Sequence, residues 1–452
     1  MSRSGSLLAI ALALFVGAGV WWALTSQRRA PEAPARLLDF SPASITGMTV
    51  RIDGREYAAA RTPSGDWELL PPAGSTLAPW PLNAGNVRAA LSVLADLRFD
   101  PTDDPGEDAT AGAVATLTTD EGDAHTVAFI GQPVGGRALA VAQNGAGRRA
   151  GFVEAPARDM LVNPGPRGWR VMQAMPGVGV EVSRVRVTTP GGTLLLGQVG
   201  GSWTLREPVA ARADATAVQN VLATLTSIPI ERFIDDGSID RAGAGLAAPT
   251  LRIVAETDAR DVLPGGDVAV RTRTRTLDVG AAADLEARSL FASPDGGATI
   301  FTIPAGALRA LPVDALACIA RAASGVAPTD VGMAHVRFVG GVERGCRRGM
   351  DGWDELAPDG AMLPLEPEPV QDMLDFLSAR LPAEVRLVDG DTDVGVPWAT
   401  VTLFGFADEP LEMIDLVRVD GAPAALSRRV LRVYRGEWPA LLTPEGVGAG
   451  GR

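Results

Sequence analysis

Hydrophobic and polar positions follow the same short pattern at three places along the chain. In residues 48–52, 183–187 and 334–338, apolar side chains occupy alternate positions around an Arg, which predicts half-buried strands. Further along each copy, apolar residues recur at positions i, i+4 and i+7, which predicts one amphipathic helix per copy. The helix positions are Val87/Leu91/Leu94, Val218/Leu222/Leu225 and Val370/Leu374/Leu377.

A Trp stands between the strand and the helix of each copy, and a Pro follows it five residues later. The pairs are Trp67 and Pro72, Trp203 and Pro208, and Trp353 and Pro358. The Trp residues are 136 and 150 positions apart, which is the size of a domain rather than of a solenoid repeat. We interpret the Trp, the Pro and the helix residues Leu91, Leu222 and Leu374 as structural repeat positions, since Trp buries a large area in a core. The alternative is that the Trp side chains stack on a ligand.

Alternating segments also follow each helix, at residues 115–117, 251–253 and 401–403. Short strands joined by hairpins around one main helix predict an α+β fold with mainly antiparallel sheet. We expect three tandem units at 37–175, 176–328 and 329–445, the third one shortened. A membrane anchor and linker would occupy 1–36, and a flexible tail would occupy 446–452.

Residues 7–24 form an uncharged apolar run of 18 residues, flanked by Arg3 on one side and by Arg28 and Arg29 on the other. A helix of that length spans about 27 Å, enough for the hydrocarbon core of a bilayer. The run therefore predicts a single-pass anchor in the lipid bilayer, and a cleavable signal peptide is the alternative. The flanking Arg residues favour a cytoplasmic bulk of the chain, but large domains can cross regardless of such charges.

The amino-acid composition limits the reactions that this chain could catalyse. The chain has 41 basic and 54 acidic residues and a net charge of −13, and all of the basic residues are Arg. Without Lys, a Walker phosphate loop and a Schiff-base nucleophile are excluded. The acidic balance argues against nucleic acid as a partner. We predict no catalytic residues, no cofactor and no metal site.

Few residues remain for metal or redox chemistry. His125 and His335 have no further ligands at metal-binding spacing, and Cys318 and Cys346 form no Cys-x-x-Cys motif, although a single disulfide between them stays open. Residues 389–393 begin like a calcium loop but lack its Gly and its final Glu. The Arg shared by the three strands, namely Arg51, Arg186 and Arg337, is the candidate interaction position; a solvated charge on an outward strand position is the simpler account.

The succession of strand, Gly-x-Trp-x-Leu, Pro, helix and second strand set, as at Gly201, Trp203, Leu205 and Pro208, resembles a bacterial family of domains of unknown function. Members of that family typically carry an N-terminal membrane helix and repeated copies of the domain, and are often encoded beside gliding-motility-type ABC transporter subunits. The resemblance implies ABC transporter subunits as partners. It also implies a place in the bacterial inner membrane with the bulk of the chain in the periplasm.

These observations predict a non-enzymatic, membrane-anchored extracytoplasmic scaffold or accessory protein of an ABC-type transport or gliding-motility-like assembly. A module that binds envelope glycans or peptides in a groove between units is the alternative, and it would require exposed aromatic side chains there. A hydrolase using paired carboxylates is a third hypothesis, which requires two carboxyl groups in one cleft.

Overall fold

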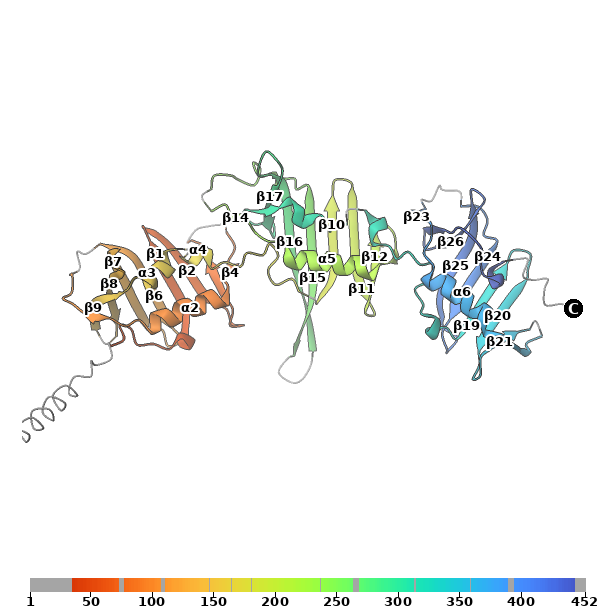
Figure 1. Cartoon of the computed structure of the whole chain (residues 1–452), viewed down its shortest axis with the longest axis horizontal. Helices are drawn as coiled ribbons and strands as arrows, with labels where there is room; N and C mark the ends of the chain where they lie inside the picture. The colour runs from red at the N-terminus through yellow and green to blue at the C-terminus, as the bar shows by residue number, and fades with distance from the viewer. Residues whose placement is uncertain are drawn as a thin grey trace, which may run out of the picture. The chain divides into compact units, whose positions relative to one another are not determined.

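Antiparallel sheet dominates the described chain, which forms three sheets of nine strands each (Figure 1). The computed structural model describes residues 35–443 except for 73–76, 107–109, 146, 164, 180, 236, 263–267, 313, 358 and 389–393. The described residues fall into two compact units, divided between Val171 and Met172. The first sheet belongs to the first unit, and the second and third sheets belong to the second unit.

The first sheet consists of two meanders that meet at its centre. Its strands are β1 (Ile45–Ile52), β2 (Arg55–Arg61), β3 (Trp67–Leu70), β4 (Trp80–Pro81), β5 (Asp100–Pro101), β6 (Ala111–Thr119), β7 (Ala124–Val134), β8 (Arg137–Asn144) and β9 (Gly147–Glu154). Their spatial order is β4-β3-β2-β1-β6-β7-β8-β9-β5. Helix α2 (Ala84–Ala95) carries the chain from β4 at one edge to β5 at the other, and the short helices α3 (Ala155–Val162) and α4 (Gly165–Gly168) follow β9.

The second sheet has the same plan. Its elements are β10 (Val182–Thr189), β11 (Gly192–Val199), β12 (Ser202–Glu207), β13 (Ala211–Arg212), α5 (Ala215–Ser227), β14 (Arg232–Phe233), β15 (Leu251–Val262), β16 (Val268–Ala282), β17 (Ser289–Pro294) and β18 (Phe301–Pro304). Two short 3-10 helices, η3 (Ala305–Leu308) and η4 (Ala315–Cys318), lead out of it.

The third sheet repeats the plan again. It contains β19 (Met333–Phe338), β20 (Glu343–Arg348), β21 (Trp353–Leu356), β22 (Met362–Leu365), α6 (Pro367–Ala379), β23 (Glu384–Leu387), β24 (Ala399–Phe404), β25 (Pro410–Val419), β26 (Ala422–Ser427) and β27 (Val430–Val433). The 3-10 turns η2 (Pro42–Ser44), η5 (Pro328–Asp330) and η6 (Ala440–Leu442) flank the first and third sheets.

The three sheets are copies of one topology, which confirms the internal repeat. The strand orders β13-β12-β11-β10-β15-β16-β17-β18-β14 and β22-β21-β20-β19-β24-β25-β26-β27-β23 match that of the first sheet position by position. The register of the central pair is also shared, because Val50 faces Ala115, Val185 faces Ala255 and Val336 faces Val401. The expected unit boundaries themselves stay a prediction.

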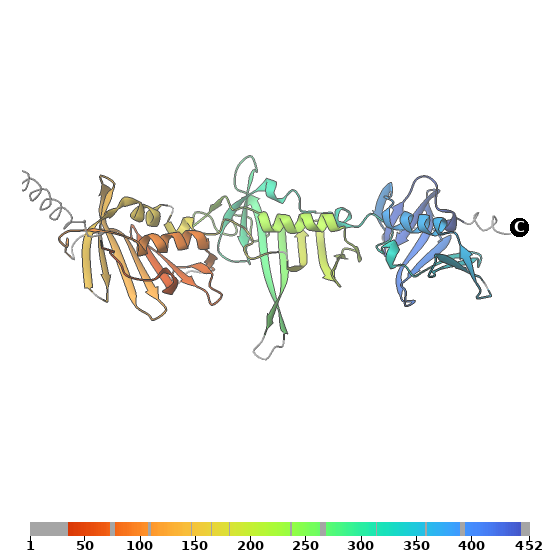
Figure 2. The same cartoon turned by 60° about the horizontal axis from the view of Figure 1, so that its bottom comes forward.

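One long helix lies against one face of each sheet, and Figure 2 shows the green α5 lying across the strands of the second sheet. The apolar stripe of each helix accounts for this arrangement. Val87, Leu91 and Leu94 of α2 are at most 3% exposed and belong to the core of the first sheet. In the same way α6 buries Val370, Leu374 and Leu377. The opposite face of each sheet carries the polar positions of the alternating strands.

The start of α2 is set by a side chain. Asn83 Oδ1 accepts hydrogen bonds from the backbone N–H groups of Gly85 (2.9 Å) and Asn86 (3.2 Å). Replacing Asn83 by Ala will cost about 1 kcal/mol of helix stability and speed hydrogen exchange of the α2 amides about fivefold. Mass-spectrometric hydrogen exchange measures this. Asn86→Ala, at an exposed helix position, is the matched control and should leave the exchange unchanged.

The second sheet has a long hairpin that its sister sheets lack. β15 and β16 pair from Leu251–Val279 to Val262–Val268, whereas β17 pairs only with residues 277–282 of β16. Residues 268–276 therefore form an edge, as the alternating Arg and Thr residues 271–276 suggest. Arg273 and Arg275 are exposed there, which protects the edge against strand addition.

The expected fold class is wrong and needs correction. Sheet accounts for most of the described structure, so the chain is mainly β rather than α+β. The two-residue strands at the sheet edges and the long meanders explain the difference, because they add strands without adding helices. The expected anchor at residues 7–24 lies outside the described residues. Within 35–443, with the gaps given above, no helix is both long enough and apolar enough to cross a bilayer, so the expected transmembrane helix is not supported.

Candidate functional site at the junction of the second and third sheets

The segment that joins the second and third sheets is held in place by hydrogen bonds within the second unit. Ile319 forms an antiparallel bridge with Ala213, at the β13 edge of the second sheet. The N–H of Asp214 donates to the carbonyl of Cys318 (2.7 Å), and the N–H of Ala320 donates to the carbonyl of Arg212 (2.9 Å). The start of the segment therefore acts as one more strand on a sheet edge whose last strand has only two residues.

The third sheet holds the rest of the segment with two charged side chains. Arg432 of β27 is 4% exposed and donates to the carbonyl oxygens of Ala320 (2.9 Å) and Arg321 (3.0 Å). Glu412 of β25 accepts from the hydroxyl of Ser324 (2.7 Å) and from the N–H of Gly325 (2.9 Å). Hydrogen bonds to charged groups are the stronger ones in proteins, so the segment is clamped to both sheets.

Arg212 approaches this segment from the second sheet. A Cβ on Gly325 would lie 1.7 Å from Nη1 of Arg212 and 2.7 Å from its Cδ, so only glycine leaves room for the Arg212 side chain in this position. Burial lowers the pKa of Arg212, and the nearby carboxylates of Glu412 and Asp214 act in the opposite direction. Burial also lowers the pKa of Arg432, and the charge of Arg212 contributes to the lowering. Two guanidinium groups from different sheets thus repel each other across the junction.

A cavity of about 200 Å³ opens between these side chains. Its polar lining consists of Thr204, Arg212, Glu412, Ser427, Arg428 and Arg432. Arg428 comes from the two-residue turn between Ser427 and Val430, where Arg428 (φ 48°) and Arg429 (φ 69°) both have left-handed backbone conformations. Such conformations cost side-chain-bearing residues about 1–2 kcal/mol each, and they concentrate at binding sites. The cavity carries three Arg side chains and one carboxylate.

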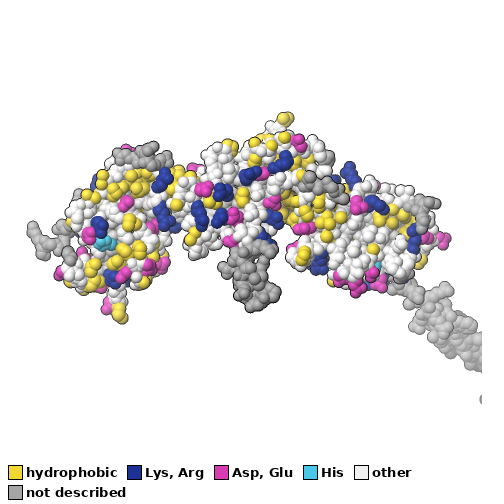
Figure 3. Space-filling view, turned by 180° about the vertical axis from the view of Figure 1, so that it is seen from behind, with side chains coloured by type: hydrophobic (Ala, Val, Ile, Leu, Met, Phe, Trp, Pro, Cys, Tyr) yellow, Lys and Arg dark blue, Asp and Glu magenta, His cyan; other side chains and the backbone are white. Residues whose placement is uncertain are grey.

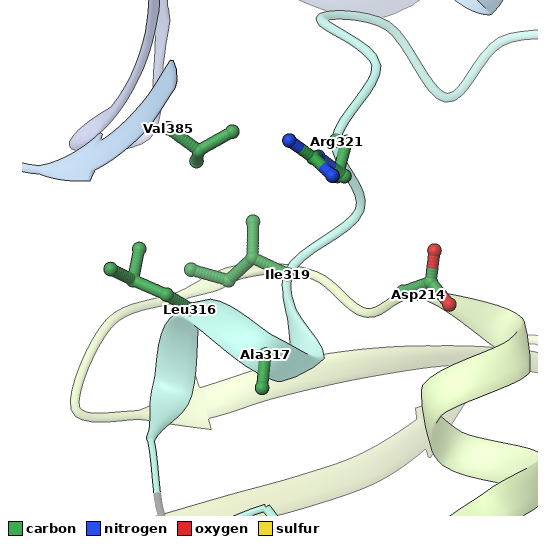
Figure 4. A pocket seen from close by; sticks show the side chains of 6 residues that line it. All are labelled: Asp214, Leu316, Ala317, Ile319, Arg321 and Val385. Atoms are coloured by element: carbon green, nitrogen blue, oxygen red, sulfur yellow. The ribbon is translucent and has the colours of Figure 1, made fainter. Parts of the chain in front are cut away.

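A second cavity, of about 420 Å³, is lined by the start of the same segment (Figure 4). Leu316, Ala317 and Ile319 line it from the second sheet's exit segment, and Val385 of β23 lines it from the third sheet. Its carboxylate, Asp214, already caps helix α5 by accepting from the N–H of Ala217 (2.9 Å). Arg321 also lines this cavity, so its charged lining consists of one Arg and one carboxylate that is already engaged, fewer charged groups than in the cavity with the three Arg residues.

The comparison with protein families bears on this part of the chain. Residues 203–392 contain a DUF4340 domain, a domain of unknown function. The DUF4340 match starts at Trp203 in the second sheet and ends beyond β23 in the third. It therefore includes Arg212 and the joining segment but not Glu412, Arg428 or Arg432. Neither the curated proteins nor the solved structures contain a match to this chain.

The repeated Trp residues lie against the sheets. Trp67 (7% exposed) and Trp353 (5%) belong to the cores of the first and third sheets, and Trp203, at the start of the DUF4340 domain, is half-buried. Of the repeated Leu residues, Leu91 and Leu374 are buried and Leu222 is half-buried. Pro72 and Pro208 are exposed, and Pro358 lies outside the described residues.

The repeated Arg residues lie on three different sheets. Arg51, Arg186 and Arg337 are exposed, each on the face of its own sheet that points away from the long helix. Arg337 forms an ion pair with Glu343 (2.7 Å), and Arg186 lies 3.7 Å from a carboxylate oxygen of Glu207. These contacts are exposed and contribute little to stability.

Each residue of the metal and redox hypotheses has local contacts of its own. His125 packs against Phe40, and His335 lies 3.4 Å from Glu343. The described residues contain no group of three or more His, Cys, Asp or Glu side chains able to hold a metal ion, and the calcium-like residues 389–393 lie outside them. Cys318 and Cys346 are both buried and unpaired.

The two thiols will be unreactive in the folded protein. Burial is the main cause that raises the pKa of both Cys318 and Cys346 to about 11. At pH 8 only about one thiol in a thousand would then be the reactive thiolate. Labelling with a thiol reagent should therefore proceed only after unfolding in urea. Rapid labelling of either thiol before unfolding would contradict the burial.

No local sequence pattern indicates that the residues at the junction form a site. Arg212 and Arg432 are 220 positions apart, and neither belongs to a repeated motif. The consecutive Arg428 and Arg429 in a turn are the only local feature near the cavity that stands out, since such turns usually contain Gly or Asn.

Proposed function

We propose that this protein is a non-enzymatic scaffold that works on the extracytoplasmic side of a bacterial inner membrane. It would act as an accessory protein of an ABC-type transport or gliding-motility-like assembly. The scaffold role rests on the architecture of repeated sheets, and the type of assembly rests on the family resemblance of the sequence. The face of the second sheet opposite α5, around the exposed Arg side chains of β10 and β12, is the surface that we assign to the partner.

The observation that supports this surface most strongly is a row of Arg side chains. Arg184 and Arg186 of β10 alternate with the core residues Val185 and Val187, so they lie on the face opposite α5. Arg206 of β12 lies above Gly197, which is directly opposite Arg184. Arg252 of β15 lies on the same face, opposite Thr188. Figure 3 shows dark blue side chains gathered over this face.

The acidic side chains on this face offset the Arg row only in part. Glu256 pairs with Arg184 (2.8 Å), and Glu207 lies 3.7 Å from Arg186. The fully buried Asp278 accepts from both Arg252 (2.7 Å) and Arg241 (3.1 Å). Even so, the side chains of Arg184, Arg186 and Arg252 are 43%, 46% and 49% exposed. Arg presents a rigid fork of donors suited to carboxylates, and Arg is enriched at interfaces between proteins. The surface therefore suits an acidic patch on a partner protein.

A charge reversal on this face tests the proposal. The double variant Arg186→Glu/Arg206→Glu should reduce co-purification of the partner subunits from native membranes by about tenfold or more, since like charges at an interface cost several kcal/mol. Arg309→Glu is the matched control, because Arg309 is exposed at the end of η3, which contacts α5 on the other face. Unchanged recovery with the double variant, or purification of the protein alone, would contradict the proposal.

The extracytoplasmic location has its own test. A topology reporter fused after Arg452 should report periplasmic exposure. Cytoplasmic exposure would overturn the location and the link to an ABC-type assembly together.

The glycan-binding alternative is less well supported. Stacking on sugars would require exposed aromatic rings, whereas Trp67 and Trp353 are buried in the sheet cores. The residues that line the two junction cavities include no aromatic side chain.

A further inference from the structure

The cavity between Arg212, Arg428 and Arg432 has a charge that its own side chains do not balance. These three Arg residues and Glu412 are the charged groups in its lining, which leaves a net charge of +2. Glu412 is already engaged with Ser324 and Gly325. Arg432 is buried and Arg212 is half-buried, and charges removed from water are normally paired with an opposite charge or with a ligand, whereas Arg428 is exposed at the rim.

The donors of two of these residues are available to a ligand. Arg432 directs its guanidinium to the carbonyls of Ala320, Arg321 and Val430. Among the described residues, the guanidinium groups of Arg212 and Arg428 form no hydrogen bond and no short ion pair. Arg212 is half-buried and fixed beside Gly325, and Arg428 is held over the cavity by the left-handed turn. Thr204 and Ser427 add hydroxyl groups to the lining.

We propose that this cavity binds a small ligand through a doubly charged phosphate group. A phosphate group carries close to two negative charges at neutral pH, which matches the net charge of the lining. Arg forks bind phosphate oxygens in pairs. A volume of about 200 Å³ accommodates a phosphate group with a short stem but not a large ligand. The inference does not depend on the proposed partner surface, which lies on the face of the second sheet opposite α5.

Binding would link the two sheets of the second unit. Arg212 belongs to the second sheet, whereas Arg428 and Arg432 belong to the third. A bound phosphate group would neutralise the repulsion between Arg212 and Arg432 and bridge the junction. The ligand should therefore raise the melting temperature of the full chain as its concentration increases.

Isothermal titration calorimetry with inorganic phosphate tests the site in the full chain. We expect saturable binding, competition by sulfate, and much weaker binding of acetate, because acetate carries a single charge. Arg212→Gln and Arg428→Ala should each weaken phosphate binding by about tenfold or more, since each removes a charge-assisted contact. Arg418→Ala, an exposed Arg of β25 outside the cavity, should leave it unchanged.

Three results would overturn the assignment. The first is the absence of phosphate binding, and the second is acetate binding as tight as that of phosphate. The third is equal phosphate affinity in the Arg212→Gln, Arg428→Ala and unmodified proteins. Arg428 is exposed and holds no other residue, so Arg428→Ala keeps the test valid even if Arg212→Gln disturbs folding. The Arg186→Glu/Arg206→Glu variant should still bind phosphate with unchanged affinity, even where it no longer recovers the partner subunits.

Discussion

Replacing Arg432 by Ala will lower the free energy of unfolding of the second unit by about 2–4 kcal/mol. Arg432 is 4% exposed, and its guanidinium donates hydrogen bonds to the carbonyls of Ala320 and Arg321. Its removal leaves these acceptors unpaired and opens a void beneath the joining segment. Urea unfolding of the full chain measures the change.

Arg418→Ala is the matched control for Arg432→Ala, because both residues lie in strands of the third sheet and Arg418 is exposed. It should change the free energy of unfolding by less than about 0.5 kcal/mol. Equal effects of the two substitutions would show that the clamp on the joining segment contributes nothing.

Substitution of the repeated Trp residues is expected to cause the second large loss of stability. Trp353→Ala and Trp67→Ala should each cost about 3–5 kcal/mol, because each Trp is buried between a sheet and its helix. Trp203→Ala should cost less, since Trp203 is only half-buried. Hydrogen exchange of the three sheets, measured separately by mass spectrometry, assigns each loss to its own sheet. A loss of stability confined to Trp203→Ala would instead indicate that Trp67 and Trp353 do not hold the cores.

The repeat could be predicted from the sequence because it rests on local patterns. Alternation around Arg51, Arg186 and Arg337 and the helix spacing from Val87, Val218 and Val370 depend on neighbours a few residues away. These patterns place β1, β10 and β19 and the helices α2, α5 and α6 where the structure has them. Local periodicity is thus enough for the longest elements.

The fold class could not be predicted in the same way. Strands of two residues, such as β5 (Asp100–Pro101) and β13 (Ala211–Arg212), are too short to show a period of two. They form because the helix returns the chain to a sheet edge that offers unpaired N–H and C=O groups. A prediction from local pattern therefore counts too few strands and gives the helices too much weight.

The junction site is a product of tertiary structure. The close approach of Arg212 to Gly325, and the clamp by Glu412 and Arg432, join residues from two copies of the repeat. No comparison of one copy with another reveals such contacts, because each copy contributes different positions. The same reasoning applies to the Arg row, whose members Arg206 and Arg252 lie in strands distant along the chain.

Site-specific photo-cross-linking in native membranes tests the scaffold proposal most directly. A photoreactive residue would replace Thr188, on the face of the second sheet opposite α5, or Ala223, on the exposed side of α5. The proposal predicts cross-links from position 188 to subunits of an ABC-type assembly and none from position 223. Cross-links from both positions alike, or none from position 188, would contradict it.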